Sequence, residues 1–124
     1  MFDHVKFGVS DYAASRAFFL AALEPLGVSV ADEGAPSYGI EIVGGGDASL
    51  CLFETTGKPA PLHIAFKAAT RAQVDAFHRA ALLAGGRDNG APGPRPRYGP
   101  NYYAAFVIGP DGHNIEAVCH RPEA

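Results

Sequence analysis

The chain has no tryptophan, one methionine and only two cysteines among its 124 residues. Cys51 and Cys119 are too few for a disulfide scaffold, so a reducing, cytoplasmic location is expected. No apolar stretch approaches the roughly 20 residues that span a bilayer, and the first residues lack the basic-then-apolar pattern of a signal peptide. The formal net charge of −3, with no run of Lys or Arg, argues against nucleic-acid or membrane binding.

What the sequence does contain is typical of a small globular domain. Hydrophobic residues make up 48% of the chain and charged residues 19%, close to the average for folded proteins. A chain of this length buries roughly two-thirds of its unfolded surface, which is enough for a hydrophobic core. We therefore expect one soluble domain rather than a disordered segment.

The first half of the chain is similar to the second half when the sequence is shifted by 59 residues. His4 then aligns with His63, Phe18 with Phe77, and Gly27 with Gly86. Nine identities fall within the 24 positions from 4 to 27, without a gap. Two copies are too few for a solenoid and predict a pseudo-twofold domain of paired modules.

Each copy reads as a strand, a helix and then β-rich segments. Alternating polarity predicts the first strand of each copy, Ser10 or Asp11 is a suitable N-cap for the first helix, and Thr70 caps the second. Glycines end both helices. The expected strands cover 4–9, 37–43, 48–54, 62–66, 102–108 and 114–119, and the expected helices cover 12–26 and 71–84.

Strand alternation separates two faces. Val5, Phe7 and Val9 are expected to pack under the first helix, which leaves His4 and His63 on the opposite face. Two histidines and the strand-borne Glu116 form a plausible ligand set for a divalent first-row metal. The alternative is that both histidines lie at the edge of the core and that Glu116 pairs with an arginine or with His120.

Three segments make the sequence recognisable: Asp3-His4-Val5, Leu62-His63-Ile64-Ala65-Phe66, and the stretch from Gly109 to Glu116 with its Asp-Gly turn. With these, the chain resembles the vicinal oxygen chelate superfamily over essentially its whole length. The resemblance implies an α+β fold of two pseudo-symmetric βαβββ modules, 1–57 and 58–124, whose curled mixed sheets surround a cavity. It also implies His4, His63 and Glu116 as metal ligands, with Glu116 the candidate catalytic residue.

The superfamily includes glyoxalase I, extradiol dioxygenases and bleomycin-resistance proteins, so the resemblance leaves the activity open. It implies a homodimer, a small-molecule substrate and a divalent metal ion such as Fe, Mn, Ni or Zn. The cavity lies either within one chain or between two. A lyase, an isomerase or a ring-cleaving dioxygenase fits this pattern, and the alternative is a metal-free protein that sequesters a ligand.

One position departs from the glyoxalase I pattern. The last strand of the first module would supply a fourth ligand there, and anchoring that strand on its turn places Cys51 at the position. Cys51 is either a soft ligand, a cavity-lining residue in contact with substrate, or a small buried hydrophobic residue. Glu41 is a weaker substitute.

The segment 89–103 is rich in proline and is expected to form an irregular loop of defined shape. It contains two arginines and three tyrosines, which could bind an anionic substrate and pack against its apolar part. The alternative is a solvated loop that packs its tyrosines on a dimer partner. The candidate substrate-binding residues are Arg95, Arg97, Tyr98, Tyr102 and Tyr103, with Cys51 from the first module.

Overall fold

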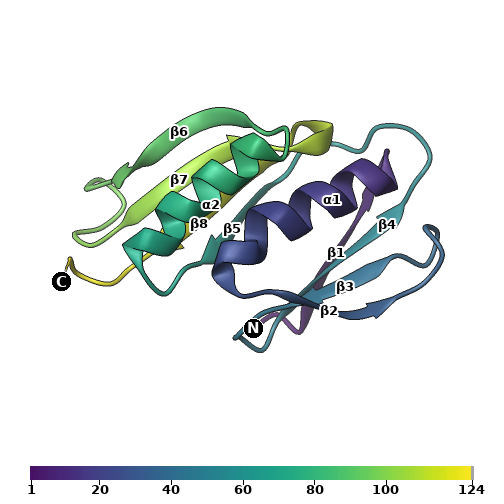
Figure 1. The fold of residues 1–124 in the computed structure, drawn as a ribbon, viewed down its shortest axis with the longest axis horizontal. Coiled ribbons are helices and arrows are strands. Elements are labelled where there is room, and N and C mark those ends of the chain that lie inside the picture. Colours follow the sequence, from purple (N-terminus) through teal and green to yellow (C-terminus); the bar gives the residue numbers. More distant parts are fainter. Residues whose placement is uncertain (124) are drawn as a thin grey trace.

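The computed structural model describes residues 1–123, so Ala124, the last residue of the second expected module, lies outside the described residues. Two helices and two four-stranded sheets follow one another in two similar halves (Figure 1). The first half contains β1 (His4–Val9), α1 (Tyr12–Leu23), a 3-10 turn (Glu24–Leu26), β2 (Ser29–Glu33), β3 (Ile40–Val43) and β4 (Ser49–Glu54). The second contains β5 (His63–Lys67), α2 (Arg71–Leu83), β6 (Arg87–Pro94), β7 (Tyr103–Ile108), a 3-10 turn (Pro110–Gly112) and β8 (Asn114–Cys119).

The two sheets have the same topology. Their strand orders are β1-β4-β3-β2 and β5-β8-β7-β6. In each, the first strand runs parallel to the last, and all other pairs are antiparallel. Both sheets are therefore mixed, and the expected α+β fold of two βαβββ modules is confirmed.

Local sequence explains where the helices begin and end. The Asp11 side chain accepts a hydrogen bond from the Ala14 amide, so Asp11 rather than Ser10 caps α1. Thr70 caps α2 through the Gln73 amide, as expected. Gly27 and Gly85 follow the helical segments with φ of 82° and 99°, a left-handed conformation that glycine adopts without steric cost.

The core lies between the helices and the sheets, with α1 and α2 packed side by side over one face of both sheets (Figure 1). Phe18 and Phe77, which are equivalent in the repeat, are both fully buried. A Cβ added at Gly86 or Gly109 would lie 2.9 Å from the Phe18 ring, so these two glycines allow the ring of the first module to enter the second. One core thus joins both modules.

The turn before β8 and the buried His113 that follows it join the modules a second time. The Asp111 carboxylate accepts hydrogen bonds from the amide and hydroxyl of Ser10 at the end of β1. His113, 1% exposed, accepts the Leu62 amide at its Nδ1, and its ring lies 5.2 Å from that of Phe7. Its Nε2 is buried and has no hydrogen-bond partner among the described residues.

Strands β2 and β6 were not expected from the sequence. All five residues of β2 are exposed, so no apolar alternation marks it. The prediction of irregular structure over 89–103 is wrong for residues 89–94, which pair with β7 through two register shifts that absorb the glycines and prolines. Both are edge strands, where such residues are tolerated because only one side of the strand is paired.

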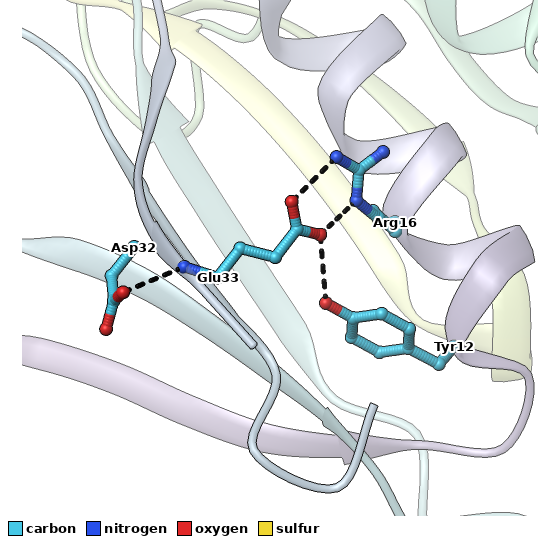
Figure 2. Close-up of polar contacts among 4 residues, drawn as sticks. All are labelled: Tyr12, Arg16, Asp32 and Glu33. Carbon is cyan, nitrogen blue, oxygen red and sulfur yellow. Dashed lines mark hydrogen bonds and ion pairs between the residues drawn. The ribbon is translucent and has the colours of Figure 1, made fainter. Parts of the chain in front are cut away.

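Side chains tie β2 to the first helix. Arg16 on α1 donates to both carboxylate oxygens of Glu33 through its Nε and Nη2, and Tyr12 donates to the same carboxylate (Figure 2). The Nη2–Oε1 distance is 2.9 Å. The exposed edge strand is therefore attached to α1 by a two-pronged ion pair.

Neither helix in residues 1–123 is long and apolar enough to cross a membrane.

Candidate functional site

The polar site of the second module lies on the sheet face that points away from the helices. Ile115 and Ala117 of β8 point into the core. Because side chains alternate along a strand, Asn114 and Glu116 point to the opposite face of the sheet. Strand pairing places Phe106 opposite Glu116 and His63 opposite Asn114. The sheet thus gathers an imidazole, a carboxylate and an aromatic ring on one face.

Glu116 is the central group of this site. It is only 2% exposed, and its Oε1 lies 2.8 Å from Nε2 of His63. Its Oε2 accepts a hydrogen bond from the Tyr102 hydroxyl. A buried carboxylate is costly unless it is paired or hydrogen-bonded, and here both oxygens have a partner.

Tyr102 remains a hydrogen-bond donor to Glu116 throughout the physiological range. Burial, followed by the hydrogen bond to Glu116, raises the pKa of Tyr102 to about 12. The ring lies edge-on to Tyr98 at 5.3 Å and to His120 at 5.1 Å. Tyr102, the expected substrate contact, thus belongs to the carboxylate cluster, and its packing against a substrate stays a prediction.

His4 lies on the other sheet. Its Nδ1 is 2.8 Å from an Asp3 oxygen, and about half of its side chain is exposed. It lines a pocket of about 210 Å³ together with Lys6, Glu41 and Cys51, whereas His63 lines a different one. Among residues 1–123, no group of three or more His, Cys, Asp or Glu side chains is placed to hold a metal ion. One chain brings together two of the three expected ligands.

The strand registers show what Cys51 corresponds to. His4 pairs with Ser49 and Cys51 follows two residues later, just as His63 pairs with Asn114 and Glu116 follows two residues later. The partly buried Cys51 is therefore the first-module equivalent of Glu116. It pairs with Lys6 on one side and Glu41 on the other, so it lies in a polar row rather than in the core.

The chemistry of the second-module pair fits a divalent metal. Imidazole nitrogen and carboxylate oxygen are both ordinary ligands of Fe, Mn, Ni and Zn, and buried charges in proteins are either paired or coordinate metals. His63 and Glu116 would hold the ion, and Tyr102 would orient Glu116.

The two arginines occupy different surroundings. Arg95 is partly buried, donates to backbone carbonyl groups and lies over the Phe106 ring, with 5.4 Å from Cζ to the ring centroid. Arg97 is exposed and donates to the Tyr98 hydroxyl at 3.2 Å. Both arginines and Tyr98 line one pocket of about 540 Å³.

Tyr103 lies apart from the other expected contacts. Its hydroxyl donates to Asp75 on α2 at 2.7 Å, and the Arg71 guanidinium lies 4.9 Å from its ring centroid. Because neighbouring residues of a strand point to opposite faces, Tyr103 is directed toward the helix. It is not part of the cluster around Glu116.

Among the lining residues of the arginine pocket that sequence reasoning missed, three have amide or aromatic side chains: Asn89, Phe106 and Asn114. The signal for two of them was available, because Phe106 and Asn114 alternate with the core residues of β7 and β8. Asn89 could not be placed, since β6 itself was not expected.

Comparison with known proteins gives one family. The model of the Glyoxalase/Bleomycin resistance protein/Dioxygenase superfamily matches residues 1–117. No curated protein matches the chain. A crystal structure of a glyoxalase/bleomycin resistance protein from Albidiferax ferrireducens is 30% identical, with a TM-score of 0.78 over 98% of this chain and 99% of that one.

More distant structures share the fold. Lactoylglutathione lyase from Agrobacterium tumefaciens is 16% identical, with a TM-score of 0.71 over 96% of this chain and 92% of that one. The oxidase ChaP-H2 is 23% identical, with a TM-score of 0.68 over 100% and 96%. The match of the family model over nearly the whole chain decides the assignment: the chain belongs to the Glyoxalase/Bleomycin resistance protein/Dioxygenase superfamily.

Proposed function

We propose that the protein is a metal-dependent enzyme that acts on a small, anionic, oxygenated metabolite as a lyase, an isomerase or a ring-cleaving dioxygenase. The observation that carries this proposal is the buried Glu116 carboxylate, held between His63 and Tyr102 on the sheet face that points away from the helices. Such an arrangement keeps a charged ligand and a proton acceptor in place before substrate binds.

A divalent metal, when bound, would polarise adjacent substrate oxygens as a Lewis acid. Glu116 is the carboxylate at this site and is the group we propose to move a proton. Tyr102 would fix the orientation of that carboxylate by donating to Oε2. One of the two arginines of the 540 Å³ pocket would hold an anionic substrate at the same face.

We further propose that two copies of the chain complete each site. His4 lines a pocket separate from that of His63. The first strands of the modules, β1 and β5, each form the edge of a different sheet. An edge strand presents unpaired amide and carbonyl groups that can pair with another chain. Placing β1 of one copy beside β5 of another would bring His4 toward His63 and Glu116.

The metal proposal is tested by titrating chelator-treated protein with Mn²⁺, Ni²⁺ and Zn²⁺ in a calorimeter. We expect one ion per chain for the native protein and a large loss of affinity for His63→Ala and Glu116→Ala. His78→Ala on α2 is the matched control and should bind as the native protein does. No binding of any ion by the native protein would contradict the proposal and favour a metal-free sequestering protein.

The shared site is tested by mixing two defective variants. His4→Ala and His63→Ala each damage both sites of a homodimer if the ligands come from different chains. A mixed dimer of the two would contain one site with both histidines intact, so mixing should restore part of the metal binding. Failure of mixed dimers to regain any binding, or a monomer in light scattering, would contradict the shared site.

A further inference from the structure

The guanidinium of Arg95 is held in one position by the loop that carries it. Its Nη1 donates to the carbonyl of Gly93 at 2.9 Å, and its Nη2 donates to the carbonyl of Ala91 at 2.8 Å. Its other side lies over the Phe106 ring. An arginine fixed in this way loses little side-chain entropy when a ligand binds.

Two glycines make room for this arrangement. A Cβ at Gly90 would lie 3.2 Å from Nη2 of Arg95 and 2.9 Å from the Phe106 ring. A Cβ at Gly93 would lie 3.3 Å from Nη1. Gly90 also has a φ of 155°, which other residues rarely adopt. The register shifts of β6 at these glycines therefore form a cradle for the guanidinium.

The cradle leaves one edge of the guanidinium free. Nη1 donates to the carbonyls of Gly93 and Pro94, the second at 3.4 Å, and Nη2 donates to the carbonyl of Ala91, while Nε has no hydrogen-bond acceptor within residues 1–123. The Nε–H is therefore free and Nη2 has a second N–H, so the Nε–Nη2 edge can take a further acceptor. This is the edge that Arg16 uses when it holds both oxygens of Glu33 (Figure 2). The same protein thus shows what this edge of an arginine binds.

The surroundings suit a carboxylate on an apolar body. The pocket contains two arginines and no carboxylate side chain, so its charge is positive. Pro94, Pro96, Tyr98 and Phe106 form apolar walls, and the linked amides of Asn89 and Asn114 add polar groups. The Phe106 ring lies 6.1 Å from that of His63, so a ligand here borders the His63–Glu116 pair.

Arg97 lacks these features. It is exposed, and its contacts are with the hydroxyl and ring of its sequence neighbour Tyr98. No cradle holds its guanidinium, so binding a ligand would order a long side chain at an entropic cost. The two arginines therefore carry the same charge in the same pocket with different degrees of order.

We propose that Arg95, and not Arg97, is a carboxylate-binding residue, and that it recognises a flat, unsaturated or aromatic carboxylate through its Nε and Nη2. This inference rests on the proposed function for calling the ligand a substrate. The binding itself requires neither a metal nor a second copy of the chain, because every proposed contact is made by a protein group in the second module of one chain.

The test uses protein stripped of metal with a chelator and titrated with benzoate, benzamide and inorganic phosphate, observed by amide chemical shifts. We expect benzoate to bind more tightly than benzamide or phosphate, because only benzoate offers two coplanar oxygens on a ring. Arg95→Met should weaken benzoate binding roughly 10-fold to 100-fold. The matched variant Arg97→Met should stay within about twofold of the native protein.

Arg95→Lys separates recognition from folding. The lysine keeps the positive charge but cannot make a bidentate hydrogen bond to a carboxylate. Its benzoate affinity should therefore fall nearly as much as that of Arg95→Met, while the spectrum of a folded protein is retained. Three results would overturn the proposal. Benzoate could bind both Arg95 variants as tightly as the native protein, Arg97→Met could lose as much benzoate affinity as Arg95→Met, or phosphate could bind as tightly as benzoate. Because metal is absent throughout, failure of the metal site would leave these results unaffected.

Discussion

The two modules share one backbone plan and carry different chemistry on it. At equivalent register positions the second module has His63 and Glu116, and the first has His4 and Cys51. His4 and His63 are both about half exposed, but His63 contacts the buried Glu116, whose two oxygens are both bound, whereas His4 is paired with its sequence neighbour Asp3 and the Glu116 equivalent Cys51 is only partly buried. Repetition of a fold therefore conserves the positions of a site without conserving its ligands or their degree of order.

The two modules also differ in how an arginine is used at the edge strands β2 and β6. In the first module Arg16 uses its free edge to hold β2 to α1, so that guanidinium is occupied by Glu33 (Figure 2). In the second, β6 pairs with β7 through register shifts, and Arg95 is fixed by carbonyls with one edge unused. One module uses its arginine for stability, and the other keeps an arginine available to bind a ligand.

The largest expected effect is on stability and comes from truncating a side chain in the core that the two modules share. Phe18→Ala should lower the free energy of unfolding by about 3–5 kcal/mol, because it deletes a buried ring that contacts both modules. Chemical denaturation followed by fluorescence and by circular dichroism should give one coincident transition. Leu83→Ala, at a site 90% exposed, is the control and should change stability by no more than about 0.5 kcal/mol. Two separate transitions in the native protein would show that the modules do not share one core.

A smaller effect concerns the carboxylate of the second module. Tyr102→Phe removes the donor to Oε2 of Glu116, and we expect metal affinity to fall roughly 10-fold to 100-fold in calorimetry. Tyr103→Phe is the matched control, since Tyr103 donates to Asp75 on the helix side of the same sheet. Equal metal affinity in Tyr102→Phe and the native protein would mean that the carboxylate needs no support from the loop.

The smallest expected effect is on the junction between the modules. Burial lowers the pKa of His113 below its usual value of 6.5, so the unfolded chain binds a proton there before the folded chain does. The free energy of unfolding should therefore fall as the pH drops below about 6.5. His113→Gln retains an acceptor for the Leu62 amide and should show a shallower decline in urea melts between pH 7 and 5. Parallel curves for the two proteins would contradict this role.

Much of the fold followed from local sequence because periodicity and capping act over short distances. The alternation at 4–9 and 114–119, the caps Asp11 and Thr70, and the repeat of Phe18 at Phe77 each reflect such local rules. Strands β2 and β6 escaped prediction because edge strands need only one paired side and can carry polar residues, glycine and proline.

The sequence by itself determined the module pattern, the family and the faces on which His63 and Glu116 lie. Tertiary structure decided which groups meet, because contacts between distant residues depend on register and on how the sheets are placed. It joined Tyr102 to Glu116, directed Tyr103 toward α2, and put His4 and His63 in separate pockets. It also fixed the Arg95 side chain and left that of Arg97 exposed. The Arg-Pro-Arg sequence does not distinguish the two residues. Their surroundings differ because β6 pairs with β7 and the glycines of β6 lie against the Arg95 guanidinium.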